Sequence, residues 1–127
     1  MTDRILIKRV YGPASAKDGV RILVDRLWPR GMSKASLKYA AWPKELAPSN
    51  ELRKWYGHDP KRFAEFRRRY RRELAAHRDE LAALRVKLKG RTVTLLTATR
   101  ELDLSHATVL REILQKPVPA KRVSLKA

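Results

Sequence analysis

The chain contains no cysteine, and this absence excludes several classes of protein. Disulfide-stabilised scaffolds, thiolate nucleophiles and the cysteine-based zinc and iron–sulfur sites all require that residue. Long apolar runs are missing as well: the longest, at 21–25 and 93–98, are strand-sized, whereas a membrane-spanning helix needs about 20 apolar residues. The first ten residues hold no signal-peptide apolar region. We therefore expect a cytoplasmic protein that does not cross a membrane.

Acidic residues are scarce. Thirteen aspartates and glutamates face 30 lysines and arginines, which gives a formal net charge of +17. Such an excess attracts phosphate-bearing or otherwise acidic partners, although a solvated basic surface with no binding role is an alternative. Three histidines lie in three separate segments and not at metal-ligand spacing, so the sequence predicts no metal and no cofactor.

Three short segments rich in β-branched residues, at 5–10, 20–24 and 92–97, predict strands. They alternate with helical segments, which favours an α/β fold: a single layered domain with a small, mostly parallel sheet flanked by helices. A chain of 127 residues fits one such domain. We place the domain at residues 1–116 and expect the basic, proline-punctuated segment 117–127 to be a loosely ordered tail.

The clearest periodicity predicts one long basic amphipathic helix from Pro60 to Lys89, begun by an Asp59 cap and ended by Gly90. An uninterrupted helix of this length would span about 40 Å, and a break within it is the alternative. Apolar residues recur there at steps of three and four, which places them on one stripe. The residues of this stripe are Phe63, Phe66, Tyr70, Leu74, His77, Leu81, Leu84 and Leu88. A last helix is expected to begin after a cap at Asp103.

Ligands of parallel sheets bind beyond the carboxyl ends of the strands. Two segments are expected there, 25–31 after the second strand and 98–106 after the third. Asp25 and His106 are therefore candidate catalytic acid–base groups, because a carboxylate and an imidazole can exchange protons near neutral pH. A salt bridge for Asp25 and a capping or packing role for His106 are the alternatives.

The same segments supply candidate ligand-binding residues. Arginine offers a planar fork that matches phosphate or carboxylate, tryptophan offers a stacking face, and glycine lets the backbone approach a ligand. Packing and turn formation are the alternatives for the tryptophan and the glycine. The predicted ligand-binding residues are Arg26, Trp28, Arg30, Gly31, His58, Thr97 and Arg100.

Several blocks of the sequence resemble the YeaO-like branch of a bacterial family, domain of unknown function 488 (DUF488). These blocks are VDRLWPRG at 24–31, LAPS at 46–49, LRKWYGHD at 52–59, and VTLL at 93–96 through the HA at 106–107. The resemblance extends from Ile5 to Leu114 and implies a small α/β domain in a family without an established activity. In a wider branch of the family, cysteines stand where Thr97 and Ser105 stand here, so thiol chemistry does not carry over to this chain.

A second function class rests on a run of arginines in the long helix. Such a face could follow a nucleic-acid backbone, and each neutralised phosphate would add about 0.9 to the salt slope of affinity. The arginines concerned are Arg67, Arg68, Arg71, Arg72 and Arg78. No helix-turn-helix, RNP-type or zinc-finger signature accompanies them, so contacts would be to the backbone and not to base sequence.

The sequence thus favours a pocket for a small anionic or phosphorylated ligand. It leaves open whether that pocket belongs to an enzyme of unassigned reaction. The alternatives are a non-catalytic, sequence-tolerant nucleic-acid-binding protein and a structural or interaction module. The oligomeric state is not predicted.

Overall fold

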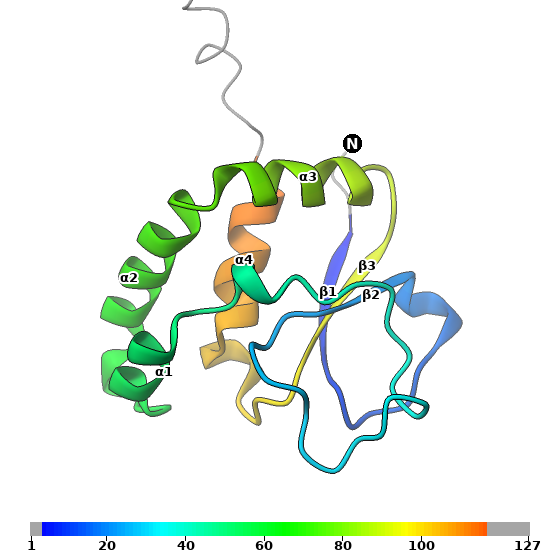
Figure 1. Cartoon of the computed structure of the whole chain (residues 1–127), viewed down its shortest axis with the longest axis horizontal. Coiled ribbons are helices and arrows are strands. Elements are labelled where there is room, and N and C mark those ends of the chain that lie inside the picture. Colours follow the sequence, from blue (N-terminus) through cyan, green and yellow to red (C-terminus); the bar gives the residue numbers. More distant parts are fainter. Residues whose placement is uncertain (1–3, 117–127) are drawn as a thin grey trace, which may run out of the picture.

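A small parallel sheet organises the part of the chain that the computed structural model describes, residues 4–116 (Figure 1). Its strands are β1 (Ile5–Arg9), β2 (Val20–Leu23) and β3 (Val93–Thr97), in the order β1-β3-β2 and all parallel. The predicted α/β fold class is confirmed. The expected tail, 117–127, lies outside the described residues.

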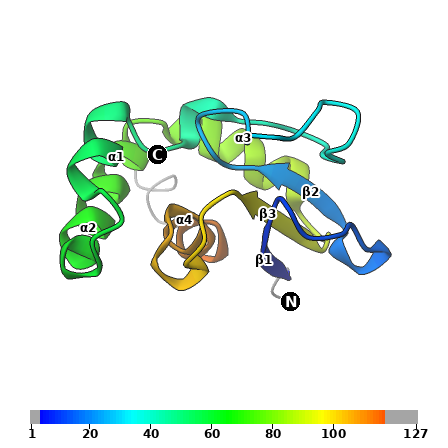
Figure 2. The same ribbon diagram turned by 90° about the horizontal axis from the view of Figure 1, so that it is seen from below.

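The four described helices lie on one side of this sheet (Figure 2). They are α1 (Asn50–Tyr56), α2 (Phe63–Ala75), α3 (Arg78–Leu88) and α4 (His106–Gln115). Figure 2 shows α1, α2 and α4 on one side of the sheet and the short 3₁₀ turn η1 (Ala16–Asp18) on the opposite side. The helices therefore flank the sheet on one side, where α4 packs on β1 and β3 and α2 packs on α4 (Figure 2).

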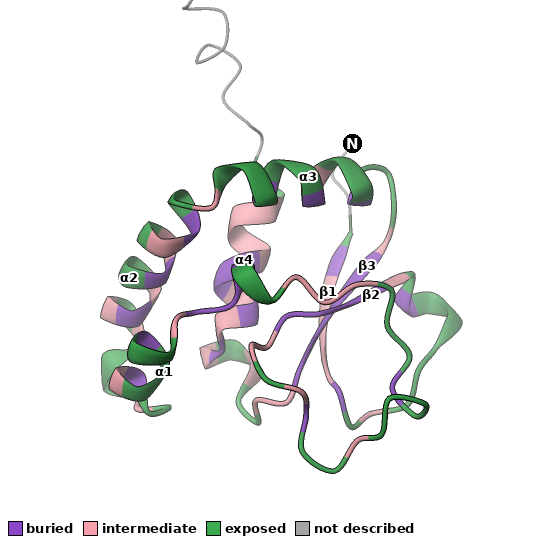
Figure 3. Ribbon diagram, viewed as in Figure 1, coloured by how far each residue is buried: buried purple, intermediate pink, exposed green. Residues whose placement is uncertain are grey.

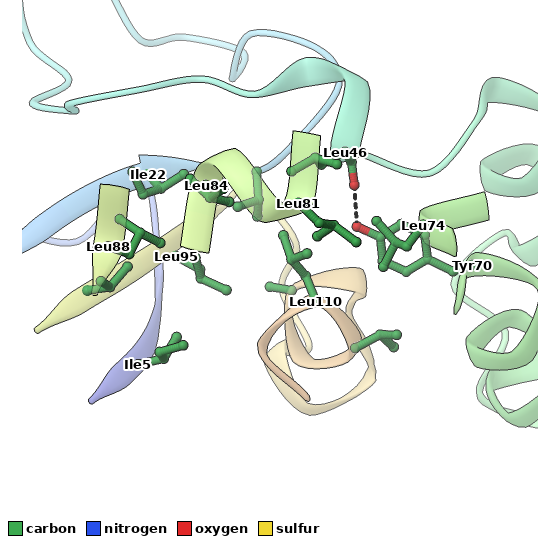
Figure 4. Close-up of a cluster of buried hydrophobic side chains, with 14 of the residues drawn as sticks. Ile5, Ile22, Leu46, Tyr70, Leu74, Leu81, Leu84, Leu88, Leu95 and Leu110 are labelled. Carbon is green, nitrogen blue, oxygen red and sulfur yellow. Dashed lines mark hydrogen bonds between the residues drawn. The ribbon is translucent and has the colours of Figure 1, made fainter. Parts of the chain in front are cut away.

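Alternation along the strands explains the two faces, because successive side chains of a strand point in opposite directions. Ile5, Ile22 and Leu95 belong to the large apolar cluster that includes leucines of α3 and α4, and Figure 4 shows these side chains together. The residues that alternate with them face the other way. There Leu23 and Leu96 form a smaller cluster that is covered by the connection from β2 to α1.

The predicted long helix is two helices. Its backbone breaks at Ala76 and His77, where His77 has the non-helical angles φ −111° and ψ 42°. The apolar stripe continues across the break, as the buried band along α2 and α3 in Figure 3 shows, but it packs on different partners. α2 packs on α1 and α4, whereas the leucines of α3 lie over the sheet. One straight helix could not serve both surfaces.

Glu73 and Tyr70 of α2 hold the start of α1 and the turn before it by hydrogen bonds. Ser49 caps α1 by accepting from the Leu52 amide at 3.1 Å, and Glu73 of α2 accepts from the Ser49 amide and hydroxyl at 2.9 and 2.6 Å. The buried Tyr70 hydroxyl donates to the Leu46 carbonyl at 2.5 Å (Figure 4). Because α1 carries one wall of the site described below, these bonds position that wall.

The amino end of the sheet holds a buried ionic cluster. Asp18 accepts hydrogen bonds from Lys8 Nζ at 3.0 and 3.2 Å and forms an ion pair with Arg21. Next to it, Gly19 adopts φ +66°, and a Cβ there would lie 2.1 Å from the Thr92 carbonyl oxygen. The amino end of the sheet is therefore closely packed and leaves no room for a further side chain at Gly19.

Within residues 4–116, no helix is both long and apolar enough to cross a membrane.

Candidate functional site

A cleft of about 690 Å³ opens at the carboxyl end of the sheet. The ends of all three strands contribute to it, together with α1, the following turn and the first turn of α4. Its lining includes five arginines and only two carboxylates, Asp25 and Glu101. Apolar lining comes from Leu27, Trp28, Pro29, Pro48, Tyr56, Pro60, Phe66 and Leu104.

Asp25 lies at the floor of the cleft with both carboxylate oxygens occupied. Oδ1 accepts from the Thr97 hydroxyl at 2.7 Å and lies 3.0 Å from His106 Nε2, and Oδ2 accepts from the Ala98 amide at 2.8 Å. Burial raises the pKa of Asp25, but the hydrogen bond and charge of His106 and the bonds from Ala98 and Thr97 lower it below its ordinary value. Asp25 is therefore an ionised carboxylate that acts on its neighbours within the protein.

His106 is oriented by two oxygen acceptors. Its Nε2 lies 3.1 Å from the Val24 carbonyl oxygen and 3.0 Å from Asp25 Oδ1. Because neither oxygen can donate, Nε2 carries the hydrogen in both protonation states of the ring. Nδ1 has no hydrogen-bond partner among the described residues and is not buried, so it is the ring nitrogen available to a molecule in the cleft.

Three of the cleft arginines were predicted, and they differ in how far they are engaged. Arg26 donates to the Pro48 and Ala47 carbonyl oxygens at 2.9 and 3.3 Å, so part of its guanidinium holds the loop before α1. Arg30 and Arg100 are exposed, and their side chains form no hydrogen bond or ion pair with any described residue. Arg30 and Arg100 are therefore the guanidinium groups that can bind a ligand directly.

The remaining predicted residues fall into two groups. Trp28 and His58 line the cleft, although Trp28 also packs edge-on against Trp42, with ring centroids 5.4 Å apart. Thr97 is buried and supports Asp25 instead of lining the cleft. Gly31 does not line the cleft either: it adopts φ +81° in an open turn, so its role is conformational.

Some lining residues were not singled out by the sequence. Arg9 ends β1, donates to the Ala98 carbonyl at 3.2 Å and lies 5.0 Å from the centroid of the Tyr11 ring. Tyr11 in turn donates to the Arg30 carbonyl at 2.9 Å. Arg53 and Tyr56 enter from α1. Arg9 could have been predicted, because the carboxyl end of the first strand lies at the same edge of the sheet as the ends of the other two. No sequence pattern indicated that Arg53 and Tyr56 of α1 would line the cleft.

The arginines of the nucleic-acid hypothesis do not form one free basic surface. Arg67 and Arg71 turn toward α4, where they pair with Glu112 at 2.8 and 3.6 Å, and Arg68 pairs with Glu65 at 2.6 Å. Arg72 and Arg78 are exposed and have no ion pair among the described residues. Pairing therefore reduces the charge that this surface offers to phosphates.

No group of three or more histidine, aspartate or glutamate side chains in residues 4–116 is placed to hold a metal ion. The cleft brings together guanidinium groups, an imidazole nitrogen and the start of a helix.

Fold and cleft together define a small α/β protein with a basic cleft at the carboxyl edge of its sheet. A family model described as "Inactive DUF488-N3 subclade" matches residues 4–125. The chain therefore belongs to the DUF488 family.

Its relatives include two bacterial proteins of similar length. The uncharacterized protein Rv3073c of Mycobacterium tuberculosis (strain H37Rv) is 47% identical over 112 residues, which cover 87% of this chain and 93% of that protein. The uncharacterized protein YeaO of Escherichia coli (strain K12) is 45% identical over 111 residues, which cover 87% and 96%. The predicted YeaO-like membership is confirmed. No solved structure matches the chain.

Proposed function

We propose that the cleft binds a small anionic ligand, a carboxylate or a phosphate ester, without converting it. The observation that carries this proposal is the charge imbalance of the cleft. Arg30 and Arg100 have no counter-ion among the described residues, and Asp25 is occupied by bonds within the protein. An anion between these guanidinium groups would form charge-assisted hydrogen bonds that no described side chain supplies.

The start of α4 supports the same proposal. Ser105 is its N-cap but makes no side-chain cap bond, and both Ser105 and His106 line the cleft. The first amide groups of a helix and its dipole favour negative charge. A bound anion would therefore meet the arginines and the helix terminus together.

Binding without chemistry is favoured by the way the candidate acid–base pair is engaged. Asp25 and His106 are within hydrogen-bond reach, but both oxygens of Asp25 already accept hydrogen bonds within the protein, and its lowered pKa makes it a weak base toward a ligand. The Tyr56 and Ser105 hydroxyls at the cleft donate to the Leu104 and Leu102 carbonyl oxygens at 2.6 and 2.7 Å, so neither is held as a nucleophile for His106. The word "inactive" in the description of the matching subclade agrees with this proposal.

The test is calorimetric titration of the protein with small carboxylates, phosphate esters and a short oligonucleotide at two salt concentrations. Arg30→Ala is compared with Arg72→Ala, because both arginines are exposed and unpaired within the described residues but only Arg30 lines the cleft. We expect Arg30→Ala to weaken small-anion binding about 10- to 100-fold, the range of one or two charged hydrogen bonds. Arg72→Ala should leave it unchanged.

The opposite pattern would overturn the proposal. If only the oligonucleotide binds, with an affinity that falls steeply with salt and depends on Arg72 and not on Arg30, the protein is a nucleic-acid binder that uses α2. Turnover of any bound ester that is lost in His106→Asn would instead show that the cleft is catalytic.

A further inference from the structure

Large apolar side chains are exposed at few of the described positions, and two of these positions line the cleft. Within residues 4–116 only Tyr11, Leu27, Tyr39 and Val86 combine a large apolar side chain with an exposed position. Two of these four, Tyr11 at 44% and Leu27 at 60% exposure, line the cleft. A single exposed leucine is ordinary, but an exposed apolar pair at the edge of a basic cavity indicates a binding surface.

Leu27 is held outward by the packing behind it. The next residue, Trp28, fills the smaller apolar cluster beside Leu37 and Leu96 and donates from its Nε1 to the Met32 carbonyl at 2.6 Å. That cluster is already occupied, so the Leu27 side chain remains at the cleft and in solvent. Its exposure is built into the fold of this loop.

Tyr11 is fixed beside the Arg9 guanidinium and the backbone of Arg30. The Arg9 guanidinium lies 5.0 Å from its ring centroid, and its hydroxyl donates to the Arg30 carbonyl at 2.9 Å. An apolar ring and the Arg9 guanidinium thus occupy one part of the cleft wall, next to the Arg30 backbone. Deeper in, Tyr56, Phe66 and Leu104 add further apolar lining.

Building on the proposed anion-binding function, we infer that the ligand is an amphipathic organic anion. Its carboxylate or phosphate group meets the arginines, and its apolar body, an aromatic ring or a branched alkyl group, covers Tyr11 and Leu27. Inorganic phosphate or a sugar phosphate would satisfy the arginines and leave these side chains in water. The cleft volume of about 690 Å³ suits a small organic molecule of this kind.

The experiment compares three phosphate probes by calorimetry: phenyl phosphate, glycerol 3-phosphate and inorganic phosphate. They share the charged group and differ in the body attached to it. We expect phenyl phosphate to bind about tenfold more tightly than the other two, which corresponds to about 1.4 kcal/mol and to burial of about 60 Å² of apolar surface. Its binding should also show the more negative heat-capacity change.

Leu27→Ser tests the apolar contact, and Val86→Ser is its matched control because Val86 is exposed at 78% on α3 and does not line the cleft. Leu27→Ser should bring the affinity for phenyl phosphate to within about threefold of that for glycerol 3-phosphate. Val86→Ser should keep the preference.

The inference and the proposed function fail in different ways. Equal binding of the three probes, or a preference that survives in Leu27→Ser, would overturn the inference; if that binding still requires Arg30, the anion-binding function stands. Failure of all three phosphate probes to bind, together with failure of the small carboxylates in the first titration, would overturn both.

Discussion

The two ends of the sheet each hold an aspartate with a lowered pKa, and the surroundings of the two differ. At the amino end, Asp18 is 3% exposed and is held by Lys8, Arg21 and the Ser15 amide. Burial raises its pKa, but the bonds from Lys8, Ser15 and Arg21 and the charge of Lys8 lower it below the ordinary value. The group is surrounded by full charges, and nothing there opens on the large cleft.

At the carboxyl end, Asp25 is held by a hydroxyl, an amide and an imidazole, and its side chain is 16% exposed. The imidazole that it orients reaches the cleft. The pKa of both aspartates is lowered, so a lowered pKa does not distinguish a structural carboxylate from one beside a binding site. The distinction is whether a hydrogen-bond partner of the carboxylate lines the cleft, as His106 does for Asp25.

The largest effect that would separate the two ends is expected for Asp18→Asn. The change leaves the buried Arg21 without its counter-ion, and breaking a buried pair in this way costs about 3–5 kcal/mol of unfolding free energy. Urea denaturation measures the loss. Asp103→Asn, at an exposed position, is the control and should stay within about 0.5 kcal/mol of the wild type. A loss below about 1 kcal/mol for Asp18→Asn would show that the ion pair at the amino end contributes no more than an exposed one.

The glycines of the two ends offer a second comparison. A Cβ at Gly19 would lie 2.1 Å from a backbone oxygen of Thr92, whereas one at Gly31 would meet no atom within 4 Å. Both have positive φ, so alanine is strained at either position, but only at Gly19 must the backbone also move. We expect Gly19→Ala to cost about 2–4 kcal/mol and Gly31→Ala about 1 kcal/mol in thermal denaturation. Equal costs would contradict the contrast between a closed and an open end.

A smaller loss of unfolding free energy, about 1–3 kcal/mol, is expected for Asp25→Asn. The amide oxygen of asparagine can still accept a hydrogen bond, but its NH₂ group would face a neighbour that is itself a donor. Thr97→Val removes one hydroxyl donor and should cost about 1 kcal/mol. Denaturation at several pH values completes the test. The folded pKa of Asp25 is lowered, so its contribution is complete above the unfolded value of about 3.9 and is lost as the pH falls through the folded value.

Asp25→Asn should therefore make the acid-induced loss of stability shallower than in the wild type. If Asp25→Asn lowered the unfolding free energy more than Asp18→Asn does, Asp25 and not Asp18 would be the main structural carboxylate.

Sequence patterns located the strands because their β-branched runs are short and bounded by turn residues. The break between α2 and α3 gave no such signal: the apolar spacing continues through it, and neither glycine nor proline marks it. The expected cap at Asp103 was wrong, since α4 begins after Ser105 and Asp103 lies in the 3₁₀ turn η4 (Leu102–Leu104). These boundaries depend on packing between segments far apart in the chain.

The site was predictable where position in the strand decides it. Asp25, Arg30 and His106 follow strand ends and do meet at the cleft. The distance between Asp25 and His106 could not be predicted, because the two are joined only through the pairing of β2 with β3. The role of Thr97 as a support for Asp25 rather than as a lining residue depends on the same register.

The strand order has a consequence for how the protein is made. β1 and β2 are each paired with β3, and not with each other, so each strand pairing in the sheet requires residues 93–97. In a growing chain, β1 and β2 therefore lack their strand partner until more than half of the sequence has been added, and only the isolated bridge from Ile22 to Ala41 can form on β2 before then. The sheet and the cleft at its edge can therefore form only late in synthesis, when β3 pairs with β1 and β2.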